Sequence, residues 1–180
     1  MKYVALLLCA VLTGCASVST QSYRPYKNRE KKAYARADRS IPFDEVKTNF
    51  QAYAETEVAW AGIIDDIQFK ENERTIQVAF DVDHRTFDWM DHGGGSRYRL
   101  SAESAGRIKV GWTVDKPARI SYLKTLAKPG YMIIVYGKPW RQGGGAIQLA
   151  ATAVRPIKSG AVEFLPGVGK EAGEEVPAAD

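Results

Sequence analysis

The sequence predicts a mainly β domain in which five strands close into a small barrel. Five strand-like segments lie between residues 58 and 154, and turns rich in glycine and polar residues separate them. One helical segment falls between the third and fourth strands, and a second precedes the first strand. This order is typical of an OB-like barrel, in which a helix between strands three and four covers one end. A β-sandwich is the alternative, because runs of short strands also form two packed sheets.

The strands are predicted from alternation and from the residues that separate them. They cover residues 58–69, 75–83, 107–114, 131–137 and 146–154, with a short additional strand at 97–101. Apolar residues alternate with small or polar ones over 75–83, as a strand with one buried face requires. Gly62 is expected to mark a bulge or bend. The glycines at 143–145 suit the positive φ of a tight hairpin turn.

Two amphipathic helices are expected. Four residues at helical spacing, Phe43, Val46, Phe50 and Tyr53, predict a short N-terminal helix over 43–53 whose aromatic stripe serves core packing. A second helix is predicted over 118–127, because proline is favourable just before a helix and the next proline and glycine end it.

The first fifteen residues indicate export and lipidation. Residues 1–14 have a cationic start, an apolar run too short to span a bilayer and small residues at the exit point, the pattern of a signal peptide. The Leu-Thr-Gly-Cys sequence that ends at Cys15 resembles the lipobox of bacterial lipoproteins. That resemblance implies that Cys15 is acylated and becomes the N-terminus. The alanine at position 16 then implies the outer membrane, on its periplasmic face.

The rest of the chain is expected to have three parts. Residues 15–40 are polar and basic and are predicted to form a lipidated tether, either a solvated spacer or a segment held against anionic headgroups. Residues 41–158 are predicted to form the barrel domain. From 159 to 180, glycine, proline, alanine and glutamate dominate without apolar periodicity, so this tail is predicted to be disordered.

Composition narrows the chemistry of the domain. The two cysteines are Cys9, in the predicted signal peptide, and Cys15, which lipid would modify. No thiol then remains for a disulfide, a nucleophile or a metal site. The formal net charge of +4 is only mildly basic and does not imply nucleic acid as a partner. The sequence specifies no cofactor and no oligomeric state.

A family resemblance follows from several of these segments. The matching features are the lipobox at Cys15 and the stretches 60–64, 76–78, 106–108 and 126–137. Over residues 58–155 the chain resembles the Slp-type outer-membrane lipoproteins of Gram-negative bacteria, a family named for starvation-inducible members. The resemblance implies an outer-membrane lipoprotein without a known catalytic mechanism, and it carries over no catalytic residues.

An acidic loop over residues 81–92 holds both histidines of the chain and is the first candidate site. Asp83, His84, Asp91 and His92 combine imidazole and carboxylate groups, which suit zinc or another divalent metal. Their spacing matches no established metal motif. A solvated acidic loop is therefore the competing interpretation.

Aromatic and cationic residues in or beside loops form the second candidate site. OB barrels bind oligosaccharides, oligonucleotides or peptides on strands two and three and the flanking loops. The predicted ligand-binding residues are Trp89, Arg97, Tyr98, Arg99, Trp140 and Arg141. Trp60 and Trp112 are instead expected to fill the barrel.

The sequence favours a binding function over catalysis. No nucleophile lies near a base in a recognisable arrangement, so the protein is predicted not to be an enzyme. We expect a lipoprotein, attached to the outer membrane through Cys15, that binds an envelope protein or glycan in a structural or stress-related role. The alternative is a metal-dependent periplasmic enzyme that uses the His84 and His92 loop.

Overall fold

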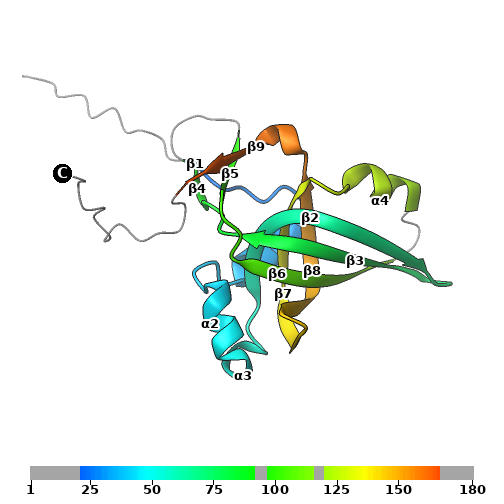
Figure 1. Cartoon of the computed structure of the whole chain (residues 1–180). Helices are drawn as coiled ribbons and strands as arrows, with labels where there is room; N and C mark the ends of the chain where they lie inside the picture. Colours follow the sequence, from blue (N-terminus) through cyan, green and yellow to red (C-terminus); the bar gives the residue numbers. More distant parts are fainter. Residues whose placement is uncertain (1–20, 92–96, 116–119, 167–180) are drawn as a thin grey trace, which may run out of the picture.

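Five strands of the protein form a closed barrel, which confirms the predicted fold class (Figure 1). The computed structural model describes residues 21–91, 97–115 and 120–166. The barrel strands are β2 (Val58–Glu71), β3 (Thr75–Arg85), β6 (Gly106–Asp115), β7 (Met132–Gly143) and β8 (Ala146–Ile157). They lie in the order β2-β3-β6-β8-β7, with β6 and β8 parallel and the other neighbouring pairs antiparallel. Helix α4 (Ile120–Leu126) lies between the third and fourth barrel strands, so the architecture is that of an OB-like barrel.

Alternate residues of the strands fill the barrel interior. Val78, Phe80 and Val82 of β3 are at most 2% exposed, as are Ile108 and Val110 of β6. The residues between them point outward, because successive side chains of a strand lie on opposite faces. The outward positions of β3 and β6 are therefore available for a binding surface.

Short helices lie near the two ends of the barrel (Figure 1). The helix predicted over 43–53 is divided into α2 (Phe43–Thr48) and α3 (Phe50–Tyr53), because Asn49 between them leaves helical geometry. Phe43 packs against Trp60 in the core at the first end. Leu123 of α4 joins the same core from the other end.

A second layer covers the outer face of β2 and β7. Met132, Ile134 and Tyr136 of β7 are fully buried in this outer layer, whereas Ile133 and Val135 belong to the barrel interior. Both faces of β7 are thus buried, which explains its uninterrupted apolar sequence. The layer involves α1 (Asn28–Arg36), β1 (Gln21–Ser22), β4 (Met90–Asp91), β5 (Tyr98–Ser101), the 3-10 turn Ser159–Ala161 and β9 (Val162–Leu165).

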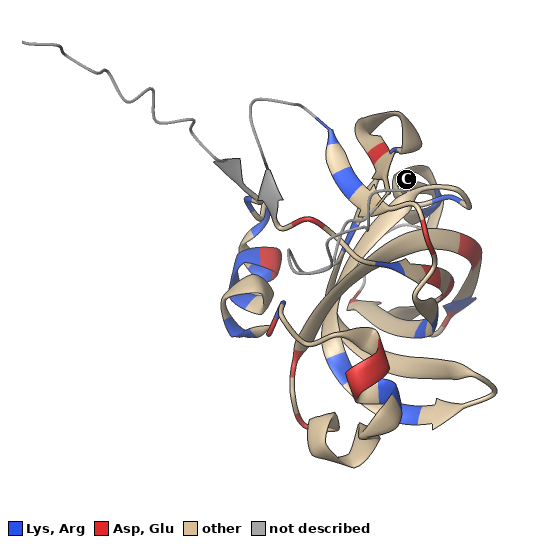
Figure 2. Cartoon of the chain, turned by 60° about the vertical axis from the view of Figure 1, so that its left-hand side comes forward, with Lys and Arg blue, Asp and Glu red and all other residues tan. Residues whose placement is uncertain are grey.

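The prediction of a basic tether over 15–40 is wrong for its described part, residues 21–40. Ala33 of α1 and Ala37, directly after it, pack in the outer layer and are 1% and 6% exposed. Alanine side chains are small, so they let a helix approach a sheet closely. Among the many charged residues of this segment they do not form a clear apolar stripe, so the sequence does not reveal that the helix packs. The Lys and Arg residues of α1 are exposed, whereas Glu30 is buried; Figure 2 marks the positions of these charged residues along the ribbon.

The prediction of a disordered tail over 159–180 is wrong for its first part. Strand β9 pairs in parallel with β5, from Tyr98 opposite Val162 to Ser101 opposite Leu165. This pairing joins segments far apart in the chain, so no local pattern in the tail announces it. Strand β5 also confirms the short strand predicted at 97–101. Residues 167–180 lie outside the described residues.

Gly62 does not form the predicted bulge. The register of β2 and β3 shifts between Ile64 and Asp66 instead. Gly62 is needed for another reason, since a Cβ atom there would lie 2.2 Å from the carbonyl oxygen of Asp83. The hairpin turn follows its prediction, with φ of 61° at Gly144 and 77° at Gly145.

Replacing Gly62 tests this close approach of β2 and β3. Gly62→Ala is expected to lower the free energy of unfolding by about 1–3 kcal/mol. The new methyl group would clash with the backbone of Asp83, which is held in the neighbouring strand and cannot move away. Gly143→Ala is the control, since nothing lies within 4 Å of its Cβ position. Urea unfolding of both variants measures the difference, and equal stabilities would contradict the packing described for Gly62.

Candidate binding surface

Two neighbouring rows of outward residues cross the sheet of β2, β3, β6 and β8. The strand register sets both rows. The first row is Asp66, Asp81, Lys109 and Gln148, and the second is Gln68, Ala79, Gly111 and Ala150. The first row is polar throughout, whereas the second has three small residues in succession. The side chains of the second row therefore rise little above the sheet, whereas the polar side chains of the first row extend further from it.

A β-bulge in β7 presents Trp140 to this surface. Pro139 pairs with Leu149 and Arg141 pairs with Gln148, so Trp140 is the extra residue between two paired ones. A bulge turns the extra side chain away from the regular alternation of the strand. Trp140 is 58% exposed and lines the hollow above the two rows. Gly143, Gly144 and Gly145 follow it in the hairpin turn, so the tryptophan lies close to a loop as well as to the sheet.

The hollow beneath Trp140 measures about 280 Å³ and is open to solvent. Lys109 Nζ lies 3.5 Å from Asp81 Oδ1, and Gln68 Nε2 donates a hydrogen bond to Asp66 Oδ2 at 3.2 Å. Exposed pairs of this kind contribute about 0–1 kcal/mol, so a ligand can replace them at little cost. With Gln148 the lining offers two carboxylates, two amides and one ammonium group.

This combination suits a ligand with both apolar and hydroxylated faces. A flat indole can stack on the C–H face of a sugar ring or on another planar group. Amides and carboxylates beside it both accept hydrogen bonds, and the amides and the lysine also donate them. The surface can therefore orient a polyhydroxylated ligand as well as hold it.

The structure places two of the six predicted ligand-binding residues at this surface. Trp140 lines the hollow, and the exposed Arg141 pairs in register with Gln148 at its edge. The other four belong to the opposite layer that contains α1. The predicted set is thus divided between two faces of the barrel.

Trp89 and Tyr98, which the sequence predicts to bind a ligand, pack as partly buried residues within the outer layer. The Trp89 ring lies edge-on to Phe87 and Tyr23, with centroids 4.7 Å and 5.5 Å apart. The backbone N–H of Tyr23 donates to the carbonyl oxygen of Trp89 at 3.1 Å. This contact holds the 86–91 segment against the N-terminal segment. Residues 86–91 are therefore part of a folded layer.

Arg155 and Glu30 form a polar centre inside the same layer. Arg155 donates from Nη1 to the Tyr23 hydroxyl at 2.8 Å and from Nη2 to the Tyr98 hydroxyl at 2.7 Å. Glu30 accepts from the Tyr23 hydroxyl and from the backbone N–H of Tyr26. Burial raises the pKa of Tyr23, and the neighbouring Tyr136 and Glu30 raise it further. Tyr23 thus stays protonated and joins α1 to β8, because its hydroxyl donates to Glu30 and accepts from Arg155.

Arg97 and Arg99 lie on β5 or just before it. Arg97 is exposed, and Arg99 Nε lies 3.8 Å from Glu163 Oε2 on β9. Neither residue lines the hollow beneath Trp140. Arg99 therefore supports the β5–β9 pairing, and the prediction that it contributes to one site with Trp140 is wrong.

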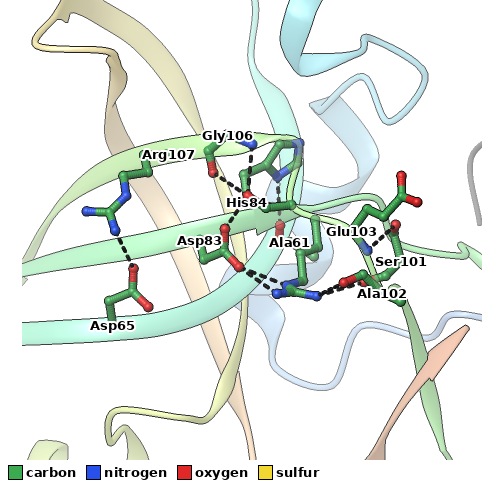
Figure 3. Close-up of polar contacts among 11 residues, drawn as sticks. Ala61, Asp65, Asp83, His84, Ser101, Ala102, Glu103, Gly106 and Arg107 are labelled. Atoms are coloured by element: carbon green, nitrogen blue, oxygen red, sulfur yellow. Dashed lines mark hydrogen bonds and ion pairs between the residues drawn. The ribbon is translucent and has the colours of Figure 1, made fainter. Parts of the chain in front are cut away.

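His84 is a core residue. It is 5% exposed, and its ring lies 5.1 Å from that of Phe43 and 5.3 Å from that of Trp60. Its Nδ1 donates to the carbonyl oxygen of Ala61 at 2.7 Å (Figure 3). Burial lowers the pKa of His84 to about 4. The imidazole is thus neutral at neutral pH and fixed in one tautomer.

The Asp83 side chain points to the face of β3 opposite that of His84, because adjacent residues of a strand point to opposite faces (Figure 3). Its carboxylate accepts from Arg85 Nε at 2.9 Å and from the Ser104 hydroxyl. Asp83 and His84 therefore do not converge. The prediction that they share a metal site is wrong, and the described residues contain no group of three His, Cys, Asp or Glu side chains able to hold a metal. His92 and the side chain of Asp91 lie outside the described residues.

A hollow of about 400 Å³ adjoins His84 on the side of α2. His84 and Trp89, which the sequence places in one loop, line it together with Arg39, which precedes α2, and Asp44 of α2. Arg39 stacks on Tyr34, with its guanidinium carbon 4.2 Å from the ring centroid. The hollow thus lies between the segment before α2, α2 itself, β2 and β3.

Most of the residues beneath Trp140 are not among those predicted from the sequence. Asp66, Asp81, Lys109 and Gln148 come from four strands and share no motif. Their alternation with buried residues marks each as outward-facing. Only the register of neighbouring strands reveals that they form one row.

Comparison with models of known protein families and with curated proteins gives no match. The Slp-type resemblance therefore stays a prediction. None of the helices in the described ranges is both long and apolar enough to cross a bilayer.

The burial of His84 predicts a pH dependence of stability. Its pKa is lower in the folded chain, about 4, than the ordinary value of 6.5, so protonation favours unfolding. The contribution of His84 is fully present above about pH 6.5 and is lost as the pH falls to about 4, a total of about 3 kcal/mol.

Urea unfolding between pH 4 and 7 measures this loss. His84→Gln should remove this part of the pH dependence, whereas His92→Gln should retain it. A slope that is unchanged in the His84 variant would contradict the buried neutral imidazole.

Proposed function

We propose that this protein is an outer-membrane lipoprotein that faces the periplasm and binds an envelope glycan in a structural or stress-related role, without catalysis. The observation that carries the binding proposal is Trp140, which a bulge presents over the small residues Ala79 and Gly111. An indole exposed above a low sheet surface offers a stacking platform. OB-like barrels use this strand face and its loops to bind extended polymers.

The polar rows favour a glycan over a protein partner. Stable protein interfaces bury about 800 Å² per partner and depend on several aromatic or arginine anchors near their centre. The lining of this hollow contains one exposed aromatic ring among carboxylates, amides and a lysine. Such a surface matches a few sugar rings better than a broad apolar protein face. A protein partner is therefore the second candidate, to be distinguished by experiment.

The anchoring proposal rests on the lipobox that ends at Cys15. A cysteine that carries more than one acyl chain is held almost permanently, whereas a single chain gives marginal attachment. The described part of the outer layer begins at Gln21, six residues after Cys15. Six residues span at most roughly 20 Å, at about 3.3–3.6 Å per residue. An acylated Cys15 would therefore hold the barrel close to the membrane surface, where it meets the nearest envelope polymer.

Binding of a defined glycan tests the role of Trp140. We expect the chain to bind a β-1,4-linked N-acetylglucosamine tetramer with a change in tryptophan fluorescence. Trp140→Ala should weaken binding about tenfold or more, by analogy with the stacking of a nucleic-acid base on an aromatic side chain, which contributes about 1–3 kcal/mol. Gly111→Val should also weaken it by filling the low row. Its Cβ is predicted to be tolerated, because the nearest atom is the Leu149 carbonyl oxygen at 3.9 Å.

Tyr122→Ala is the matched control, because Tyr122 is 52% exposed but lies on α4, away from the hollow. Fluorescence titration and calorimetry give the affinities. Failure of the unmodified chain to bind the tetramer, or full binding by Trp140→Ala, would contradict the proposal. A photo-crosslinker at position 140 that captures a protein in whole cells would favour the second candidate.

Substitution of each cysteine tests the anchor. Cys15→Ser should abolish incorporation of labelled palmitate and release the chain from outer-membrane fractions. Cys9→Ser should leave both unchanged, because Cys9 lies in the predicted signal peptide. Palmitate labelling followed by membrane fractionation measures the two effects. Retention of the label in Cys15→Ser would refute the assignment of the lipidated residue.

A further inference from the structure

A second cavity lies where α4 meets the barrel, and the proposed glycan-binding surface does not use it. Its volume is about 250 Å³, close to the lower end of the roughly 300–1,000 Å³ of small-molecule sites. An apolar cavity of about 150 Å³ already admits a benzene molecule in other proteins. This cavity is therefore large enough for an organic group.

Most of the wall is apolar and comes from the barrel and α4. Phe69, Val78 and Phe80 of β2 and β3 form one part, and Leu123 and Leu126 of α4 form another. Phe80 and Leu123 also belong to the main core, so the cavity extends from the core toward the solvent. Water gains few hydrogen bonds against such a wall. An alkyl chain would instead bury its own surface there.

The charged residues that line the cavity come from the start of α1 and from β8. Three of them are positively charged, namely Lys27, Arg29 and Arg155. Glu30 supplies the single carboxylate. Arg29 Nε donates to the carbonyl oxygen of Thr152 at 2.7 Å, so its charge is fixed near the rim. The local excess of two positive charges favours an anionic group at the edge of an apolar space.

Trp112 adds a polar group to the wall. Its Nε1 is buried and has no hydrogen-bond partner among the described residues. Buried indole N–H groups usually find a partner. A ligand that carries an acceptor is one way for such a donor to be satisfied.

We infer that the cavity between α4 and the barrel binds the alkyl chain of a single-chain amphiphile with an anionic head group, such as a fatty acid, with its head beside Lys27 and Arg29. The apolar wall accounts for the chain, and the one-sided charge accounts for the head. This site is separate from the Trp140 hollow. The two activities are therefore expected to fail independently.

Direct binding of laurate tests the inference. The Cys15→Ala chain, which carries no acyl group of its own, is titrated with laurate below its micellar concentration and followed by calorimetry. We expect saturable binding of one laurate per chain. Dodecyltrimethylammonium, with the same chain and a cationic head, should bind at least tenfold more weakly. The indole N–H resonance of Trp112, assigned with Trp112→Phe, should shift during the laurate titration.

Matched variants locate the site. Leu126→Trp should reduce laurate affinity at least tenfold by filling the cavity, whereas Tyr122→Trp changes an exposed position of the same helix and should not. Lys27→Glu should weaken binding, and Lys31→Glu, one turn further along α1, should have little effect. Trp140→Ala should bind laurate normally.

Three results would overturn the inference. The first is no saturable binding of laurate by the Cys15→Ala chain. The second is equal binding of the anionic and cationic amphiphiles, which would remove the role of the charged rim. The third is unchanged affinity in both Leu126→Trp and Lys27→Glu. If Leu126→Trp fails to fold, Lys27→Glu and the Trp112 resonance decide.

Binding of laurate only by the Cys15→Ala chain and not by the acylated one would overturn a free amphiphile as the ligand and assign the cavity to the chain's own lipid.

Discussion

The structure depends on the burial of β7 on both of its faces. Ile133 and Val135 fill the barrel, while Met132, Ile134 and Tyr136 are covered by the layer that α1 and the two small sheets build outside it. A fully buried aliphatic side chain contributes about 1.5–3 kcal/mol, so an uncovered outer face would forfeit much of the stability of this strand. The layer is assembled from segments at both ends of the described chain.

Because only one side of the barrel is covered, a binding surface is available on the other side. The side of the barrel formed by β2 and β7 is closed by α1 and by the polar centre of Arg155 and Glu30, which ties the N-terminal segment to β8. The opposite side, over β3 and β6, keeps its outward residues in solvent. The bulge at Trp140 then adds an aromatic group to a surface that is otherwise polar and low. Packing on one face thus leaves the other free for binding.

Residues that a sequence suggests as metal ligands or binding residues can instead have structural roles. His84 and Asp83 adjoin in an acidic segment and suggest a metal site, yet the strand directs one into the core and the other toward Arg85. Trp89 stands beside glycines and suggests an exposed contact, yet it fills the outer layer. In each case the alternation of a strand or the return of a loop separates residues that are neighbours in the chain. The reverse holds for Asp81 and Lys109, which are distant in the chain and adjacent on the barrel.

The sequence by itself determined the five barrel strands, the helix between the third and fourth of them, and the glycine turn before β8. These features depend on local alternation and on backbone preferences, which each segment carries within itself. Only the tertiary structure decided that α1 packs on the barrel and that β9 pairs with β5. It also decided the role of Gly62 and which residues form the surface beneath Trp140. Alanine contacts, parallel pairing of distant strands and strand register all depend on partners far away in the chain, so no local pattern encodes them.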